Sequence, residues 1–333
     1  MTTSREIRLK SRPVGTPTAD NFELATVELP APGPGEVQVR NSWMTVDPYM
    51  RGRMNDVKSY SPPFQLGEAM QGGAVGEVIA SNDPAFAVGD LVQSFFGWRE
   101  AFNAPVAAVQ KLDTFGLPPQ TFLGVAGMPG MTAWAGLLKI AALKDGDVVF
   151  VSGAAGAVGS VVVQIAKIKG HKVIGSCGGA DKVAFLKSLG CDEVIDYKAE
   201  KDLTAALARV APTGIDVYFE NVGGEHMDAA LANARPFARF ALCGMISQYN
   251  ATSEMYGIKN LIQAVGRCIK LEGFIVSNHY QHLPEFLQDM SSWINDGKLK
   301  WTETIDEGIE NAPGAFLKLF TGENTGKMLV KLS

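Results

Sequence analysis

The sequence predicts an α/β protein in which a six-stranded, doubly wound parallel sheet accompanies a separate β-rich domain. From about residue 125 onward, short apolar runs alternate with helix-like segments, and this alternation is typical of a parallel sheet covered on both faces. The preceding residues instead carry short strand-like runs separated by Pro, Gly and Asp turns. At 333 residues the chain is also long for one hydrophobic core, which favours two domains.

The elements of the predicted α/β domain, residues 126–304, follow one another in strict alternation. Its strands are expected at Val148–Ser152, Lys172–Ser176, Asp192–Tyr197, Ile215–Glu220, Arg239–Cys243 and Leu271–Val276. Its helices are expected at Ala157–Lys169, Asp181–Leu189, Glu200–Val210, Gly223–Ala232, Ile258–Cys268 and Pro284–Asp296. Six parallel strands are the number that fills a dinucleotide-binding sheet.

The predicted β-rich domain comprises residues 1–125 and takes in the C-terminal tail, residues 305–333. Its clearest strands are Glu36–Asn41, Gly73–Ala80 and Asp90–Phe96. The tail contains a helix near Gly314–Phe320 and an alternating segment, Lys327–Leu332, which we expect to return to this domain as a strand. Turn-rich spacing of this kind favours a barrel-like or partly open sheet.

Composition excludes several classes of partner and compartment. The net charge is −5, and no basic cluster is long enough to indicate a nucleic-acid or membrane surface. No apolar run reaches the ~20 residues that a membrane span needs, and the polar N-terminus does not have the form of a secretory signal. The four cysteines form no CxxC pair, so we expect reduced thiols and a cytoplasmic protein.

A glycine-rich turn follows the first strand of the α/β domain and opens its first helix. The residues expected to hold a cofactor here are Gly153, Ala155, Gly156, Ala157, Val158 and Gly159. Glycine is required where the chain turns sharply and where backbone approaches a pyrophosphate, and the helix that follows presents unpaired N–H groups to it. A G-x-x-G-x-x-G turn alone is weak evidence, but its place between strand and helix predicts a dinucleotide site.

The end of the second strand favours NADPH over NADH. NAD sites place an Asp or Glu there for the ribose 2′-hydroxyl, but the segment after Gly175 reads Ser-Cys-Gly-Gly. Asp181 is close by, but it precedes a helical run and is expected as its N-cap. Lys182 can offer an ammonium group to a 2′-phosphate, although a solvated first-turn lysine is the alternative interpretation.

The sequence offers no metal site. Residues 1–125 contain neither cysteine nor histidine, and the pair His279 and His282 has no third ligand nearby. Hydride chemistry without a metal suits reduction of an electron-poor C=C bond, because only one donor to the carbonyl oxygen is needed as the enolate forms.

Several motifs resemble the medium-chain dehydrogenase/reductase superfamily. They are PGPGEVQVR (32–40), AVGDLV (87–92), GMTAWAGL (130–137), the glycine turn and IDVYFENVGG (215–224). The chain also lacks the Gly-His-Glu run of zinc-dependent members, reading Gly-Glu-Ala-Met from Gly67. The resemblance covers essentially the whole chain and implies a Rossmann domain plus a GroES-like catalytic domain.

Within that superfamily the chain is similar to the zinc-free double-bond reductases: leukotriene B4 12-hydroxydehydrogenase/prostaglandin reductase, plant alkenal reductases and bacterial curcumin reductase. The matching strings are VDPYMRGRM (46–54), DYK (196–198), ENVGG (220–224), CGMISQYN (243–250) and GENTGKMLVK (322–331). These are unusual strings in the same order, so the resemblance is specific. It implies an NADPH-dependent enzyme without a metal.

The resemblance also implies roles for individual residues. The implied cofactor contacts are Lys182 at the 2′-phosphate, Tyr197 at the adenosine end, and Asn221, Cys243 and Asn324 along the nicotinamide half. Tyr249 would also contact the cofactor and would direct its hydroxyl at the substrate carbonyl. Tyr49, Met50 and Tyr256 would contact the substrate. A second ligand for the 2′-phosphate finds no match in residues 176–180. Relatives pair through an edge strand, here Leu271–Val276, which implies a homodimer.

We therefore expect an NADPH-dependent reductase of α,β-unsaturated aldehydes and ketones, with a small-molecule enone or alkenal as its substrate. A quinone oxidoreductase is the nearest alternative, and an alcohol dehydrogenase remains open. A non-catalytic NADPH-binding sensor is a further alternative from another class. The apolar and aromatic character of Tyr49, Met50, Tyr60, Phe64 and Tyr256 suits substrates with hydrophobic tails.

Overall fold

The structure is a computed structural model that describes residues 1–332 and contains two compact units. One unit comprises Met1–Leu123, Glu303–Asn324 and the residues from Met328 onward. The other comprises Gly124–Thr302 together with Thr325–Lys327. Both units therefore draw on the C-terminal tail, and each is described separately below.

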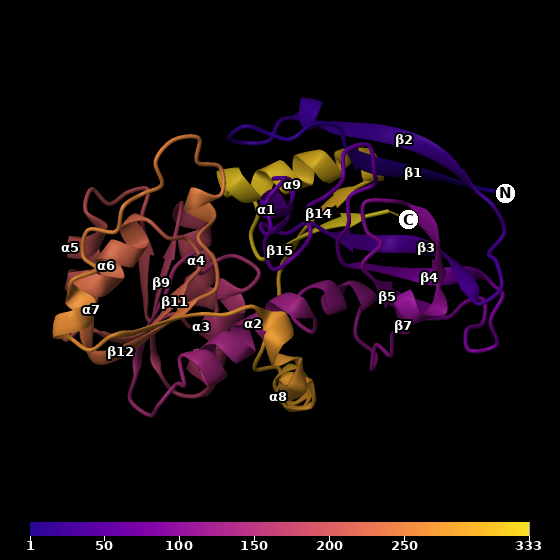
Figure 1. The fold of residues 1–333 in the computed structure, drawn as a ribbon. Coiled ribbons are helices and arrows are strands. Elements are labelled where there is room, and N and C mark those ends of the chain that lie inside the picture. The colour runs from indigo at the N-terminus through magenta and orange to yellow at the C-terminus, as the bar shows by residue number, and fades with distance from the viewer. Residues whose placement is uncertain (333) are drawn as a thin grey trace. The chain divides into compact units, whose positions relative to one another are not determined.

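The second unit is built on a six-stranded parallel sheet with the strand order β10-β9-β8-β11-β12-β13. Figure 1 labels its strands β9, β11 and β12. Its strands are β8 (Val148–Val151), β9 (Lys172–Cys177), β10 (Glu193–Asp196), β11 (Ile215–Glu220), β12 (Ala234–Leu242) and β13 (Lys270–Gly273). Its helices are α2 (Met128–Ala135), α3 (Gly159–Ile168), α4 (Ala180–Ser188), α5 (Leu203–Val210), α6 (Glu225–Asn233), α7 (Gln263–Gly266) and α8 (Leu283–Asn295). The chain order reverses between β8 and β11, and ligands bind at such switch points in doubly wound sheets. The predicted doubly wound fold is confirmed.

Strand β8 shows why its sequence is apolar throughout. Val149 and Val151 belong to the core formed with α2, α3 and α8, whereas Val148 and Phe150 belong to the core formed with α5 and α6. Successive side chains of a strand point to opposite faces, so a strand covered on both faces must be apolar at every position.

The predicted elements at the β13 edge of this sheet are wrong in extent. The predicted helix over 258–268 is reduced to α7, because the carboxylate of Asp228 accepts the backbone N–H groups of Lys259 (2.9 Å) and Asn260 (2.8 Å) and holds that segment as a turn. The predicted strand over 271–276 ends at Gly273, because its partner β12 ends at Leu242 and provides no further backbone to pair with. At α4, Gly179 rather than Asp181 is the N-cap.

The first unit is built on antiparallel sheets. Its elements are β1 (Thr2–Leu9), β2 (Phe22–Leu29), β3 (Glu36–Thr45), α1 (Met50–Arg53), β4 (Ala74–Ser81), β5 (Leu91–Ser94), β6 (Ala101–Pro105), β7 (Val109–Lys111), β14 (Glu303–Glu307), α9 (Ala312–Thr321) and β15 (Lys327–Lys331). A seven-stranded sheet has the order β14-β15-β3-β4-β5-β7, with β6 also on β3. Leu329 of β15 lies opposite Thr45 of β3, so the tail does return as a strand to the β-rich unit.

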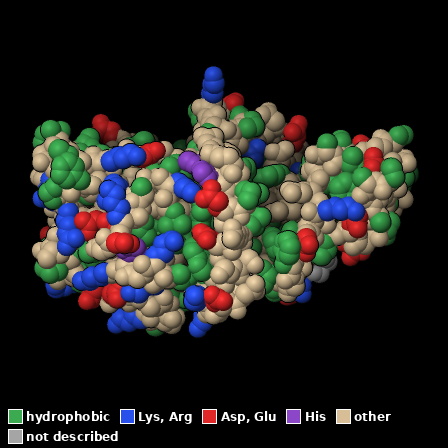
Figure 2. All heavy atoms as spheres, turned by 90° about the horizontal axis from the view of Figure 1, so that it is seen from below, with side chains coloured by type: hydrophobic (Ala, Val, Ile, Leu, Met, Phe, Trp, Pro, Cys, Tyr) green, Lys and Arg blue, Asp and Glu red, His purple; other side chains and the backbone are tan. Residues whose placement is uncertain are grey.

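Acidic and basic side chains are interspersed on the face shown in Figure 2, in keeping with the mixed charge of the sequence. Among residues 1–332, none of the helices has the length and apolar character that crossing a membrane requires.

Candidate functional site

The glycine turn joins β8 to α3 in a conformation that its glycines allow. Gly153 has φ +57°, a value that side chains rarely tolerate, and the N–H of Gly156 donates to the Gly153 carbonyl (3.1 Å). A Cβ at residue 159 would lie 2.5 Å from that same carbonyl oxygen, so only glycine lets α3 begin against the turn. The turn thus brings the N-terminus of α3 to the carboxyl end of β8, where a pyrophosphate can be held.

The C-terminal tail pairs with this turn, a contact that the sequence did not indicate. Gly326 donates its N–H to the Ala155 carbonyl (2.8 Å) and forms a parallel bridge with Gly156. Gly326 has φ +67°, and a Cβ there would lie 1.9 Å from the Thr302 carbonyl oxygen. The sequence indicated only that the two glycines of the GENTG string allow tight turns. It did not indicate which segment the tail would contact.

A buried hydrogen-bond network supports Asn221, the residue that follows β11. The Ser152 hydroxyl donates to Glu220 Oε1 (2.7 Å) and accepts the N–H of Asn221 (2.8 Å). The Asn221 side chain donates to the Ser152 carbonyl (2.7 Å). Glu220 Oε1 also accepts the N–H groups of Val222 (2.7 Å) and Gly223 (2.8 Å). One carboxyl oxygen therefore fixes the backbone of the whole loop that carries Asn221.

Burial shifts the pKa values of the Glu220 carboxyl and of the nearby Cys243 thiol. Glu220 is fully buried, and desolvation raises the pKa of its carboxyl despite the hydrogen bonds that oppose the shift. The Tyr218 hydroxyl neighbours Glu220 Oε2 without forming a well-aligned hydrogen bond to it. Burial and the nearby Glu220 raise the pKa of the Cys243 thiol to about 12, so Cys243 is a neutral thiol and not a nucleophile.

Tyr249 lies in the loop after β12, with its hydroxyl against the backbone of that loop. Its oxygen accepts the N–H of Met245 (3.3 Å) and would lie 2.9 Å from a Cβ at residue 244. The Tyr249 hydroxyl can therefore occupy this position only because residue 244 is a glycine and has no Cβ. The half-buried tyrosine is at the carboxyl end of the sheet, one residue past the short 3-10 turn Ile246–Gln248.

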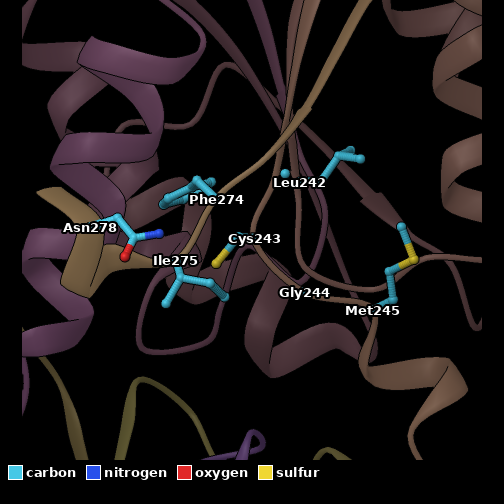
Figure 3. Close-up of a pocket in the computed structure, with 8 residues that line it drawn as sticks. Leu242, Cys243, Gly244, Met245, Phe274, Ile275 and Asn278 are labelled. Atoms are coloured by element: carbon cyan, nitrogen blue, oxygen red, sulfur yellow. The ribbon is translucent and has the colours of Figure 1, made fainter. Parts of the chain in front are cut away.

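A cavity of about 350 Å³ opens beside Cys243, at the carboxyl ends of β12 and β13 (Figure 3). Its lining residues are Leu242, Cys243, Gly244, Met245, Gly273, Phe274, Ile275 and Asn278. Figure 3 shows the Cys243 sulfur and the side chains of Ile275 and Asn278 around one space. The β13 side of this cavity was not predicted, because residues 274–276 were expected to belong to the strand itself.

Lys182 and Tyr197 lie around a second loop, the one that follows β9. The Tyr197 hydroxyl would lie 2.8 Å from a Cβ at Gly178, so the ring packs directly on that glycine. The same ring meets His226 edge-on, with 5.3 Å between centroids. Lys182 is half-buried in the first turn of α4, and its pKa is lowered, first by burial and then by the charge of Lys198.

The other predicted contacts are distributed over both units. Tyr256 donates its hydroxyl to Asp228 (2.8 Å), so that hydroxyl is anchored within the second unit. In the first unit, Tyr49 is half-buried, Met50 is fully buried in the core and Asn324 follows the end of α9. The roles of Tyr49, Met50, Tyr256 and Asn324 stay predictions. In residues 1–332 there is no group of three or more His, Cys, Asp or Glu side chains that could hold a metal ion.

Comparison with known proteins shows similarity over the whole chain. A family model described as the N-terminal domain of oxidoreductase matches residues 5–112, and one described as zinc-binding dehydrogenase matches residues 157–292. A putative NADP-dependent oxidoreductase of Bacillus subtilis is 45% identical, covering 100% of this chain and 99% of that protein. The NADP(+)-dependent 2-alkenal reductase of Nicotiana tabacum is 42% identical, covering 99% and 98%.

A solved structure gives the same result for the fold. CurA from Vibrio vulnificus in complex with NADPH is 46% identical, covers 99% of each chain and superposes with a TM-score of 0.94.

Proposed function

Because the chain belongs to the medium-chain dehydrogenase/reductase superfamily, among its NADP-dependent double-bond reductases, we propose that it reduces the C=C bond of α,β-unsaturated aldehydes and ketones with NADPH. The observation that carries the proposal is the Tyr249 hydroxyl, held against Gly244 and Met245 at the carboxyl edge of the sheet. A relative named as a 2-alkenal reductase matches the chain along its full length and supports the same chemistry.

The second unit fits a dinucleotide. Gly159 lets α3 begin against the turn, and Gly178 leaves room beside the Tyr197 ring that any Cβ would fill. Asn221 and Cys243 are the proposed contacts of the nicotinamide half, and the cavity beside Cys243 supports this, since ligands bind outside the carboxyl ends of parallel strands. Ala155, Ala157 and Val158 complete the proposed pyrophosphate-binding turn.

When bound, NADPH would supply the hydride that reduces the β-carbon of the substrate. The contribution of the protein is to stabilise the negative charge that develops on the carbonyl oxygen, and Tyr249 is the proposed donor. Because its oxygen accepts the Met245 N–H, the Tyr249 hydroxyl is polarised and becomes a better donor. A proton from solvent would then add to the α-carbon, so that one hydride and one proton are added across the C=C bond. Tyr49, Met50 and Tyr256 remain the proposed substrate contacts.

The test compares two substrate classes on one enzyme. We expect NADPH consumption with a medium-length 2-alkenal, and mass spectrometry should identify the saturated aldehyde as the product. A quinone oxidoreductase would instead consume NADPH with quinones and leave the alkenal unchanged. No turnover across a panel of enones and quinones, with NADPH still bound, would favour the sensor alternative.

We further infer a homodimer formed through the β13 edge of the second unit. Among residues 1–332, β13 is the last strand of the sheet after β12, and the backbone groups on its outer edge have no neighbouring strand. Near this edge in sequence, Leu261, Ile262 and Val265 are 53%, 71% and 76% exposed. Exposed apolar side chains in the segment that leads into an edge strand suit an interface between two copies.

We also propose that the protein is cytoplasmic. Its four cysteines are free thiols, and the cytoplasm keeps thiols reduced.

Light scattering on a sizing column should give the mass of a dimer for the wild type and of a monomer for the double variant Ile262→Asp, Val265→Asp. The charged side chains would have to lose their hydration at the interface. Val88→Asp, at an exposed position of the first unit, is the matched control and should stay dimeric. A double variant that remains dimeric would place the interface elsewhere.

A further inference from the structure

In the second unit, hydrogen bonds connect the loop after β9 to the loop after β10. The adenosine end of the cofactor is proposed to lie at these loops. The Tyr197 N–H donates to the Cys177 carbonyl (3.0 Å), joining the end of β10 to the end of β9. Asp196 Oδ1 accepts two further N–H groups, from Gly179 (3.0 Å) and from Lys198 (3.1 Å). The backbone of residue 198 is therefore fixed relative to the loop that leads into α4.

This connection places the Lys198 side chain over the same glycine as the Tyr197 ring. Lys198 Cε would lie 2.8 Å from a Cβ at Gly178, the same distance as the Tyr197 hydroxyl. Any side chain at residue 178 would displace both. Gly178 thus serves to admit a lysine and a tyrosine that arrive from the neighbouring strand.

Lys198 is also close enough to Lys182 for the two charges to interact. Burial is the largest cause that lowers the pKa of Lys182, and repulsion from Lys198 lowers it further. Two neighbouring ammonium groups, one in the first turn of α4 and one in the loop after β10, repel each other, and a dianionic phosphate between them would remove that cost. The nearby carboxylate of Asp196 already accepts two backbone N–H groups, which reduces its repulsion of an anion.

We propose that Lys198 binds the 2′-phosphate of NADPH together with Lys182 and is a determinant of specificity for NADPH over NADH. Lys198 supplies the second phosphate ligand that residues 176–180 do not. Lys182 reaches the phosphate from the first turn of α4, and Lys198 from the loop after β10. A dianion held by two ammonium groups discriminates strongly against a ribose that carries only hydroxyl groups.

The test measures binding by titration calorimetry, separately from turnover. The ligands are NADP⁺ and NAD⁺, with 2′,5′-ADP and 5′-AMP as fragments that do not reach the nicotinamide side. Lys198→Met should weaken binding of NADP⁺ and 2′,5′-ADP by about tenfold, as expected for a lost charge-assisted hydrogen bond, and leave NAD⁺ and 5′-AMP unchanged. Lys198→Arg should retain most of the affinity. Lys201→Met, at the next exposed lysine along the chain, is the matched control.

Equal weakening of NADP⁺ and NAD⁺ by Lys198→Met would overturn the proposal, because the lysine would then support the loop and not the phosphate. Unchanged affinity for both cofactors would overturn it too. An equal loss of NADP⁺ affinity in Lys201→Met would show that only the general positive charge of the surface matters. None of these outcomes depends on the identity of the reduced substrate.

Discussion

Replacing Tyr249 by phenylalanine is expected to lower kcat for an enone by about 100- to 1000-fold, the usual cost of removing one donor from an oxyanion site. The change deletes the hydroxyl and keeps the ring, so the Gly244–Met245 loop stays packed against it. NADP⁺ affinity should remain within about twofold, because the lost interaction forms only as charge develops on the substrate. Stopped-flow measurement of NADPH oxidation and a separate NADP⁺ titration would measure the two effects.

Tyr280→Phe is the matched control, since Tyr280 is a partly exposed tyrosine of the same unit outside the proposed site. It should leave both kcat and NADP⁺ affinity unchanged. A Tyr249→Phe enzyme with the kcat of the wild type would exclude Tyr249 as the donor. An equal loss of NADP⁺ affinity and of kcat would assign Tyr249 to cofactor binding instead.

Glu220→Ala should produce the largest loss of stability. The substitution removes the acceptor of the buried Ser152 hydroxyl and of two backbone N–H groups, one buried and one partly buried, and it leaves a cavity. We expect the free energy of unfolding to fall by about 2–5 kcal/mol. Glu220→Gln should cost less than about 1 kcal/mol at a pH below the raised pKa of the Glu220 carboxyl, because its amide oxygen can accept the same three hydrogen bonds and both side chains are then uncharged.

The dependence of stability on pH distinguishes Glu220→Gln from the wild type. The pKa of Glu220 is raised above its ordinary value of 4.5, so the folded state keeps a proton that the unfolded state releases. The free energy of unfolding of the wild type should therefore fall as pH rises from about 4.5 through the folded-state pKa. Glu220→Gln lacks this titration and should gain stability relative to the wild type over that interval.

Urea denaturation at about pH 5 and about pH 8 would measure both effects. If Gln were as destabilising as Ala, Glu220 would have to be ionised in the folded protein, and its network would be a charged one. NADP⁺ affinity should follow the same order, with Gln close to the wild type and Ala weaker, since the network positions Asn221.

Much of this protein follows from local patterns in its sequence. The continuous apolar run of β8 could only be a strand covered on both faces, and the glycines from Gly153 to Gly159 could only follow it as a turn into α3. These inferences hold because side-chain periodicity and backbone freedom are properties of consecutive residues. The residues proposed at the cofactor were found in the same way, at strand ends and by resemblance.

Tertiary contacts decided the rest. The helix predicted over 258–268 failed because the carboxylate of Asp228, some thirty residues earlier, accepts the N–H groups of Lys259 and Asn260. No local pattern joins Gly326 to the glycine turn or brings the Lys198 side chain onto Gly178. The sequence by itself determined the order of strands and helices and the class of cofactor, because these depend on neighbours along the chain. Only the tertiary structure decided which loops meet at the carboxyl edge of the sheet, because that depends on hydrogen bonds between segments far apart in sequence.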